Sequence, residues 1–550
     1  MTKTKKNWVT KTMTATVVVL VALVWSTSAN SNNIYKDLYN NISTYSDIYK
    51  EVSVRYVDEI DQEKILKASI DGMLNVLDPY TAYFDKENKE ELQITIDGKY
   101  EGVGIPLNYR NEEVTVAEPP FLGTPAHRAG IRAGDKIIKV DGVSTKELGY
   151  QGTVQKIRGP EGTEVILTIL REGSKLPIEF TLVREKIKLD VVRYYGVLGD
   201  GIGYVHLTNF SKNSARDVAQ AVYKLKEQNI KSLILDLRGN PGGILEEAVE
   251  LSDLFLPKNK MIVSNRGRIQ GSTQEYKSVH DPLYGDLPLA VLVNGYSASA
   301  SEIVTGAIQD HDRGVVVGDT TFGKGLVQQV VPISSNSALK ITTAKYYTPS
   351  GRSIQKQNYD SIHDSTDTPL LAYHTDGGRP VHGGGGIAPD VYVELPTVSD
   401  YVIDLRRKSL FFNFSVYYAS AGVTLDSTNL VTPKVLNDFK DYLKTKDYQY
   451  KHPFEKRLEA FKDEAAEEGF SQDVMVEIDK MKSVLDASKE TLFDQNQEDI
   501  QTLLMHELAS KFYSTNFEVE LSLKEDPVVQ KAMEILNDTK EYNRILKTKK

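Results

Sequence analysis

The chain contains 550 residues, 40% of them hydrophobic and 26% charged, and its formal net charge at neutral pH is −10. This length exceeds what one hydrophobic core supports, so about two to four domains are expected. The acidic balance argues against nucleic acid as a partner, and the absence of cysteine excludes disulfides, thiol catalysis and cysteine metal sites.

The first residues have the features of an export signal. Four lysines in the first eleven residues precede an apolar run over residues 15–25, and small residues follow up to Ala29. The apolar run is shorter than the roughly 20 residues that a membrane-spanning helix needs. The sequence therefore predicts an export signal over residues 1–29, cleaved after Ala29, and a periplasmic or secreted protein. Retention of the signal as a membrane anchor is the alternative.

Residues 30–97 form a mostly helical region. Its apolar residues recur at helical spacing before a turn at residues 77–81. The repeating positions are Ile65, Ile70, Met73, Leu74 and Leu77. The simplest interpretation is a helical cap on the domains that follow.

A second unit extends from residue 98 to residue 188. Its short strands, the turn at residues 123–131 and the segment 133–142 resemble a PDZ domain, although an ordinary glycine-rich hairpin is the alternative. The resemblance implies that a peptide adds as an extra strand and that backbone N–H groups hold its terminal carboxylate. Because glycine permits close backbone approach, the carboxylate loop is predicted at Gly102, Val103, Gly104 and Ile105.

From residue 189 to residue 398 apolar strands and amphipathic helices alternate, which is typical of an α/β core. One strand leads into a glycine-rich turn at residues 236–243. Asp236 and Arg238 begin this turn, and we expect them to brace it rather than to act chemically.

The candidate nucleophile lies further along this core. Residues 289–294 are a buried-strand run, small residues follow at 295–302, and apolar residues recur at helical spacing over 303–310. A strand, a tight turn and a helix place a small side chain beside exposed backbone N–H groups at the positive end of a helix, which suits a nucleophile that passes through an oxyanion. Ser299 is the candidate. The alternative is that these serines only cap the helix.

The candidate base lies in the next turn. Lys324 follows a short apolar strand and lies 25 residues after Ser299 (324 minus 299). A lysine in a glycine-flanked turn near a serine on a strand-to-helix turn has the layout of a Ser/Lys dyad. We expect apolar neighbours to favour the neutral amine of Lys324; these neighbours are Phe322, Leu326 and Val327.

Two other interpretations of this region are less well supported. Residues 318–324 have the spacing of a phosphate-binding loop, but Gly325 replaces the Ser or Thr that would hold magnesium. A Ser-His-Asp triad would need His311, yet no neighbouring residue in the sequence orients it, and Ser297 and Ser301 occupy the places that glycines take in a nucleophile elbow.

Residues 294–302 and 322–328 together resemble the carboxy-terminal processing (tail-specific) peptidases, serine endopeptidases with a Ser/Lys dyad and a PDZ domain. The resemblance implies that Ser299 is the nucleophile, Lys324 the general base and Gln328 its supporting residue. It extends over about residues 34–393.

The resemblance also implies an oxyanion hole and a regulatory residue. The hole combines the backbone N–H of Ala300 with a glycine N–H of the turn at residues 236–243, and the choice between Gly242 and Gly243 stays open. Arg158 corresponds to an arginine that senses ligand at the PDZ domain. In some relatives the N-terminal helical region is a dimerisation arm, which is the alternative to a helical cap.

Two regions depart from the resemblance. Residues 356–385 are a polar, glycine-rich insertion, and the glycines at 383–386 suggest a mobile surface loop. The histidines in this insertion lack metal-ligand spacing. Residues 440–537 are rich in Lys, Glu, Leu and Ala with helical periodicity and predict an appended helical domain, which could hold substrate, bind an adaptor or contribute to oligomerisation.

We therefore predict a multidomain α/β protein with an α/β peptidase core, an inserted or preceding PDZ domain, an N-terminal helical region and a C-terminal helical extension. Its predicted function is that of a serine endopeptidase that recognises protein C-termini and cleaves exported proteins, and a non-catalytic PDZ scaffold is the alternative. No cofactor or metal is expected. Expected partners are substrates with free C-termini; an adaptor and homo-oligomerisation stay open. The predicted segments are 1–29, 30–97, 98–188, 189–398 and 399–550.

Overall fold

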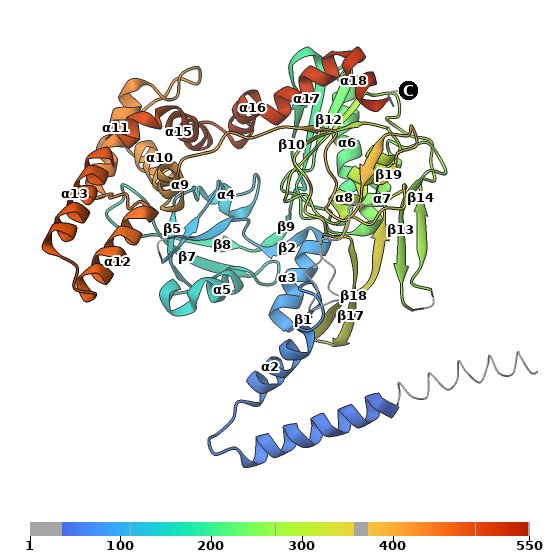
Figure 1. The fold of residues 1–550 in the computed structure, drawn as a ribbon, viewed down its shortest axis with the longest axis horizontal. Coiled ribbons are helices and arrows are strands. Elements are labelled where there is room, and N and C mark those ends of the chain that lie inside the picture. The colour runs from blue at the N-terminus through green and yellow to red at the C-terminus, as the bar shows by residue number, and fades with distance from the viewer. Residues whose placement is uncertain (1–35, 111, 270, 357–371, 490, 548–550) are drawn as a thin grey trace, which may run out of the picture. The chain divides into compact units, whose positions relative to one another are not determined.

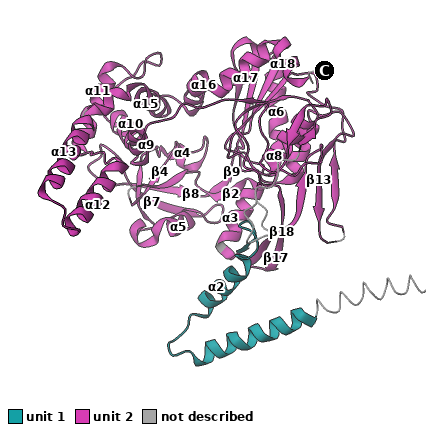
Figure 2. Cartoon of the chain, viewed as in Figure 1, with its two compact units in different colours: residues 1–83 teal, residues 84–550 magenta. Residues whose placement is uncertain are grey.

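The computed structural model describes residues 36–110, 112–269, 271–356, 372–489 and 491–547. The chain forms two compact units, Met1–Tyr83 and Phe84–Lys550 (Figure 2). The export signal predicted over residues 1–29 lies outside the described residues. No helix in the described part of the chain is long and apolar enough to cross a membrane.

The first unit contains a helix over residues 36–55 and α2 (Gln62–Leu74). Asp61 caps α2, because its side chain accepts hydrogen bonds from the backbone amides of Glu63 and Lys64. The longer helix leaves large apolar side chains exposed at Leu38, Tyr39, Ile42, Tyr45, Ile48 and Val52.

The second unit begins with α3 (Lys86–Asp97) and the segment predicted as a PDZ domain (Figure 1). Its sheet has the order β3-β4-β5-β7-β8, with β6 (Val143–Ser144) paired to β5. A separate ribbon pairs β2 (Lys99–Gly102) with β9 (Glu185–Lys188). The remaining elements of the domain are β3 (Leu107–Arg110), β4 (Glu113–Val116), α4 (Pro125–Ala129), β5 (Lys136–Val140), α5 (Thr145–Ile157), β7 (Glu164–Leu170) and β8 (Ile178–Val183).

The predicted α/β core contains a six-stranded sheet of order β10-β11-β12-β15-β16-β21, in which only the first pair is antiparallel. Its central strands are fully buried and mostly apolar, because helices cover both faces of a parallel sheet. The strands are β10 (Val192–Val197), β11 (Ile202–Leu207), β12 (Ser232–Asp236), β15 (Leu289–Val293), β16 (Val315–Gly318) and β21 (Val391–Tyr392).

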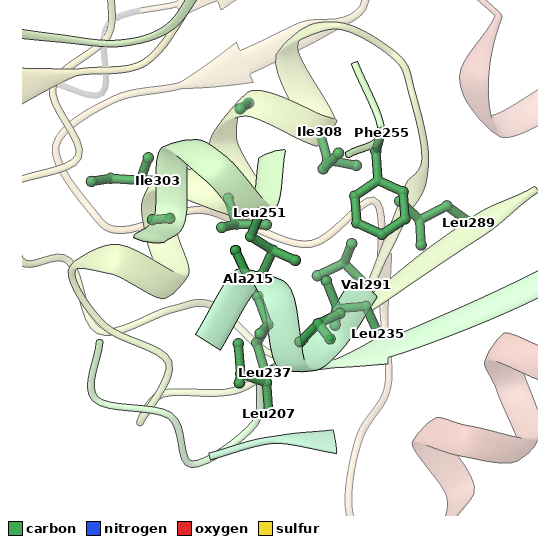
Figure 3. Packing of buried hydrophobic residues seen from close by; sticks show 14 of the residues in the cluster. Leu207, Ala215, Leu235, Leu237, Leu251, Phe255, Leu289, Val291, Ile303 and Ile308 are labelled. Carbon is green, nitrogen blue, oxygen red and sulfur yellow. The ribbon is translucent and has the colours of Figure 1, made fainter. Parts of the chain in front are cut away.

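Helices α6 (Ser214–Glu227), α7 (Leu245–Asp253) and α8 (Ala300–Asp310) cover one face of this sheet. Figure 3 shows residues of these helices and of the strands in one buried cluster, among them Leu251, Ile303 and Leu235. All residues of α8 are buried. The strand-turn-helix predicted around Ser299 is thus confirmed as β15 followed by α8.

The other face of the sheet is covered by α17 (Pro527–Asn537) and α18 (Thr539–Leu546). We predicted a single helical domain over residues 399–550, but these two helices pack on the peptidase sheet instead. The apolar side chains of α17 that do so are Val528, Val529, Ala532, Ile535 and Leu536. The parallel sheet needs such a cover on its second face.

The other C-terminal helices form a core of their own, rich in stacked aromatic rings such as Phe411 on Phe439. The helices of this core are α9 (Asp400–Arg407), α10 (Leu410–Ser420), α11 (Pro433–Thr445), α14 (Leu492–Gln495) and α15 (Gln497–Phe512). A smaller cluster is formed by α12 (Pro453–Glu467) and α13 (Gln472–Lys489). Helix α16 (Thr515–Glu525) leads to α17.

A second sheet in this unit joins β13 (Met261–Gly267), β14 (Gln274–Lys277), β17 (Leu326–Ser334) and β18 (Ser337–Tyr347). In it, β17 and β18 form a long antiparallel hairpin. Lys324 lies two residues before β17, so the hairpin begins directly after the turn that carries the predicted base.

Part of the predicted insertion is ordered as a hairpin of β19 (Ala372–His374) and β20 (Pro380–His382). We predicted that the insertion over residues 356–385 is a mobile surface loop, but its described end does not fit this prediction, because Gly383 and the following Gly386 are buried. A Cβ atom on Gly386 would lie 2.4 Å from the carbonyl oxygen of Thr321. These glycines allow the chain to pack against the turn that carries Lys324. Residues 357–371 of the insertion, including His363, lie outside the described residues.

Candidate active site

Ser299 occupies the turn between β15 and α8 and is half-buried. Its backbone has φ 56° and ψ −112°, which side-chain-bearing residues rarely adopt and which costs about 1–3 kcal/mol. Such strain persists only where surrounding contacts hold it. The contacts that hold Ser299 are therefore the starting point for the site.

Glu302 supplies the first of these contacts. Its Oε2 accepts a hydrogen bond from the backbone N–H of Ser299 at 2.8 Å. The same oxygen accepts a second hydrogen bond from the backbone N–H of Lys324 at 2.9 Å. One carboxylate oxygen thus joins the turn of the predicted nucleophile to the turn of the predicted base.

The other oxygen of Glu302 is equally occupied. Oε1 accepts hydrogen bonds from the Thr321 hydroxyl at 2.6 Å and from the Gly323 amide at 2.7 Å. Burial raises the pKa of Glu302, and these hydrogen bonds oppose the rise because they favour the charged form. Each oxygen of the Glu302 carboxylate thus accepts two hydrogen bonds, four in all. Glu302 is therefore suited to hold the two turns and not to act as a base.

Tyr346 of β18 holds the other side of the serine backbone. Its hydroxyl donates to the carbonyl oxygen of Ser299 at 3.1 Å. The ring is fully buried, and burial raises the pKa of the hydroxyl well above its ordinary value, so it remains a donor. Tyr346 and Glu302 together fix both backbone polar groups of Ser299.

The two serines that flank Ser299 have structural contacts. Both Ser297 and Ser301 are fully buried. Ser297 Oγ donates to the carbonyl oxygen of Leu237 at 2.8 Å, and Ser301 Oγ donates to that of Asn240 at 2.9 Å. They tie the turn of Ser299 to the glycine-rich turn at residues 236–243.

Gly242 packs directly against Ser299. It has φ +96°, and a Cβ atom there would lie 2.8 Å from both Ser299 Cβ and the Ala300 nitrogen. Only glycine fits this position. Its own amide donates to Asn240 Oδ1 at 2.9 Å, so it is already engaged in this structure.

Gly243 is placed differently. It forms a parallel bridge with Phe210, which donates to the Gly242 carbonyl at 3.0 Å and accepts from the Ile244 amide at 2.8 Å. In such a bridge the flanking residues bond to the partner, so the N–H of Gly243 itself points to the opposite side. Of the two glycines, Gly243 is the one whose N–H this geometry leaves available.

Asn240 is a site residue that sequence reasoning missed. It is fully buried, and its side chain donates to the Leu207 carbonyl at 2.9 Å while accepting from the Gly242 amide. Its backbone carbonyl accepts from the Ala298 amide at 3.0 Å. The sequence does show an asparagine inside a glycine-rich turn, but Leu207 and Ala298, to which it bonds, are distant in sequence.

Asp236 and Arg238 brace the start of this turn. The guanidinium lies 2.6 Å from Asp236 Oδ2, and Tyr204 donates to the same oxygen at 2.7 Å. Burial alone would raise the pKa of Asp236, but the positive charge of Arg238, its hydrogen bonds to the carboxylate and the charge of His206 together outweigh burial and lower it. The ion pair therefore keeps Asp236 charged inside the protein.

The surroundings of Lys324 differ in part from the prediction. Leu326 is buried and Val327 packs against the core, but Phe322 is 45% exposed and not part of the core. The side chain of Lys324 itself is half-buried. Gln328 lies on β17, and its amide donates to Thr342 Oγ1 at 3.3 Å.

His311 lies at the opposite end of α8 from Ser299. A helix of eleven residues is about 16 Å long. The ring nitrogens of His311 lie 2.8 Å from Asp376 Oδ2 and 2.6 Å from the Met261 carbonyl oxygen. The structure therefore gives no support to a triad through His311.

The chain is similar in sequence to known proteins over most of its length. The family description "Peptidase family S41" matches residues 201–362, and "PDZ domain" matches residues 122–171. A carboxy-terminal-processing protease from Bartonella bacilliformis is 37% identical over 393 residues, which are 71% of this chain and 82% of that protein. The chain belongs to the carboxy-terminal processing proteases, a family of serine-type peptidases.

Other matches extend over the rest of the carboxy-terminal processing protease. "Activating protease CtpB N-terminal domain" matches residues 7–88, and "Probable PDZ-protease, C-terminal helical domain" matches residues 401–536. A carboxyl-terminal-processing protease from Synechocystis is 40% identical over 295 residues, 52% of this chain and 68% of that protein. A solved photosystem II D1 C-terminal processing protease is 26% identical, covers 64% of this chain and 92% of that chain, and has a TM-score of 0.35.

The predicted carboxylate loop of the protease follows β2 directly. The carbonyls of Val103 and Gly104 accept hydrogen bonds from Ala126 and Phe121, both at 3.0 Å. Gly104 has φ +80°, and a Cβ atom there would lie 2.4 Å from Thr124 Cβ. The loop is therefore held by its carbonyls and by a position that only glycine can occupy.

Arg158 ends α5 beside this loop. Its guanidinium forms an ion pair with Glu91 of α3 and lies 5.2 Å from the centre of the Tyr100 ring. Burial raises the pKa of Tyr100 to about 12, although Arg158 lowers it. In this structure the predicted sensor is thus paired with a carboxylate of the protein itself.

Proposed function

We propose that this protease cleaves exported proteins by a Ser/Lys dyad after its PDZ domain has bound their C-termini. The observation that carries the dyad is the carboxylate of Glu302, which joins the turns of Ser299 and Lys324. A shared buried acceptor supports the view that these two turns, 25 residues apart in sequence (324 minus 299), act together.

The proposed reaction needs a neutral Lys324. Ser299 Oγ attacks the carbonyl carbon of the scissile bond, and Lys324 Nζ takes the hydroxyl proton. The tetrahedral intermediate then breaks the carbon–nitrogen bond, and Lys324 returns the proton to the leaving amine. Water cleaves the acyl-enzyme by the same steps. Gln328, four residues further along the chain, is proposed to orient Lys324.

The oxyanion of the intermediate needs two N–H donors. We assign these to Ala300, the first residue of α8, and Gly243. Ala300 lies at the positive end of the helix, which favours negative charge. Gly243 is preferred to Gly242 because the amide of Gly242 already donates to Asn240.

Substrate recognition is assigned to residues 102–105 of the PDZ domain. The carbonyls of Val103 and Gly104 are bonded to the domain, and the Gly104 amide bonds to the Tyr100 hydroxyl, so a ligand carboxylate would be held by the remaining amides of this loop. A peptide would add alongside β3 and place its carboxylate on these amides. Arg158 would leave Glu91 when a ligand is bound, which would make it a sensor of occupancy.

Two further features complete the proposal. Residues 1–29 would direct export, so that the enzyme acts in the periplasm or outside the cell. The exposed apolar side chains of the helix over residues 36–55 support pairing with a second copy of the chain, which light scattering on the enzyme with and without this helix would detect.

The direct test is digestion of an unfolded protein such as casein. The wild type should cleave it, Ser299→Ala should not, and a chelator should leave the activity unchanged. Full activity of Ser299→Ala would refute the dyad, and no cleavage by a folded wild type would favour a scaffold that only binds peptides.

A further inference from the structure

Asp526, in the C-terminal helical region, contacts the turn that carries the proposed oxyanion donor. Its Oδ2 lies 2.7 Å from Arg238 Nη1. The two side chains are each only 19% exposed, so water screens their attraction less than it would on an open surface. The distance in sequence between the partners hides this ion pair from sequence analysis.

Asp526 divides its two oxygens between two tasks. Oδ1 caps α17 by accepting hydrogen bonds from the amides of Val528 at 2.9 Å and Val529 at 3.1 Å. Oδ2 faces Arg238. Asp526 therefore anchors α17, which covers the second face of the sheet, to the turn that follows the carboxyl end of β12.

Arg238 is held from the opposite side by Asp236. Its Nε lies 3.0 Å from both oxygens of Asp236, and its backbone amide donates to Oδ1 at 2.9 Å. The guanidinium therefore lies between a carboxylate at the end of β12 and the carboxylate that caps α17. The chain runs on from Arg238 through Asn240 to Gly243.

We infer that Asp526 is a positioning residue for the oxyanion hole. It acts through Arg238, whose place between two carboxylates keeps the following turn against the nucleophile turn. Without the charge of Asp526, Arg238 is held by Asp236 alone, and the turn gains freedom to shift. This inference rests on the proposed function of the turn.

A displaced oxyanion donor weakens binding of the transition state more than binding of the substrate. We therefore expect kcat to fall while KM stays nearly constant. Complete loss of an oxyanion donor costs 10²- to 10³-fold in other enzymes, so a loosened turn should cost about tenfold.

The chain offers a variant that separates the two tasks of Asp526. Asparagine is as good a helix cap as aspartate, so Asp526→Asn keeps the cap of α17 and removes only the charge that faces Arg238. The matched control is Asp538→Asn. Asp538 caps α18 with the same distances, 2.9 and 3.1 Å, and no ion pair of Asp538 is present among the described residues.

The experiment measures kcat and KM of both variants, their Tm, and their affinity for a peptide aldehyde, which forms an oxyanion on the serine. Asp526→Asn should lower kcat and aldehyde affinity about tenfold, with KM within about twofold. Asp538→Asn should match the wild type. Equal kcat and aldehyde affinity in Asp526→Asn and wild type would overturn the inference.

A double-mutant cycle tests whether Asp526 acts through Arg238. In an Arg238→Gln background, Asp526→Asn should have no further effect on kcat. A full additional loss in that background would overturn the inference. An inactive wild type would instead refute the proposed function, so the two failures are distinguishable.

Discussion

Glu302 Oε2 lies 2.9 Å from the backbone nitrogen of Lys324. The helix that begins after Ser299 therefore also holds the lysine turn, because Glu302 lies in its first turn. The positions of Ser299 and Lys324 thus depend on one buried carboxylate, which accepts hydrogen bonds from both backbones.

Replacing Glu302 tests this dependence. Glu302→Gln turns one acceptor oxygen into an amide donor, which cannot accept from the backbone N–H groups that face it. We expect kcat to fall at least about 100-fold and the free energy of unfolding to fall by about 2–4 kcal/mol, since buried donors lose partners. Thr305→Val is the control, because Thr305 bonds to Ser301 on the same helix. Wild-type activity in Glu302→Gln would contradict the role of this carboxylate.

The glycine turn allows a controlled comparison of strain and contact. Gly242 and Gly239 both have positive φ, but a Cβ atom on Gly239 meets nothing within 4 Å, whereas one on Gly242 meets Ser299 and Ala300. Gly239→Ala should cost only about 1 kcal/mol of stability and retain most activity. Gly242→Ala should abolish turnover. Similar activity of the two variants, measured on casein, would show that the close approach is not needed.

The ion pair of Asp236 predicts a specific pH dependence of stability. Arg238 lowers the pKa of Asp236 below its ordinary value of 3.8. The stabilisation is therefore present above pH 3.8 and is lost as pH falls through the lower pKa of the folded state. The Tm difference between wild type and Asp236→Asn should be largest near neutral pH and shrink in acid. A difference that is constant down to pH 2.5 would contradict this assignment.

Recognition of C-termini by the PDZ domain predicts a dependence on the terminal carboxylate. Amidation removes the charge that the amides of residues 102–105 would hold, so amidated peptides should bind more weakly than free acids in a fluorescence anisotropy assay. Arg158→Ala should reduce stimulation of cleavage by a bound peptide. Equal binding of both peptide forms would rule out this recognition mode, and normal stimulation in Arg158→Ala would remove the sensor role.

The elements around the site could be predicted because their signals are local. The apolar strand, the small residues and the helical spacing around Ser299 are contiguous, and they form β15 and α8 as expected. Lys324 follows a second buried strand in the same way. The predicted family and the predicted α/β core with its PDZ domain are also confirmed, and they too were predicted from contiguous motifs.

The contacts that hold the site could not be predicted because they join distant residues. Glu302 and Lys324 are 22 residues apart in sequence, and Asp526 lies in the C-terminal helical region, far from Arg238 in sequence. Similarly, the periodicity of α17 indicated a helix but not that its apolar face covers the peptidase sheet. Phe322 was expected to enclose the lysine, but the direction of a side chain in a turn does not follow from its hydrophobicity.

The most direct test of the central claim is the pH dependence of casein cleavage by the wild type, Lys324→Arg and Lys324→Ala. A lysine base must be neutral, so wild-type activity should rise with pH, and Lys324→Arg should be as inactive as Lys324→Ala because a guanidinium keeps its charge. If Lys324→Arg retained more than about a hundredth of wild-type kcat, Lys324 would not be the general base.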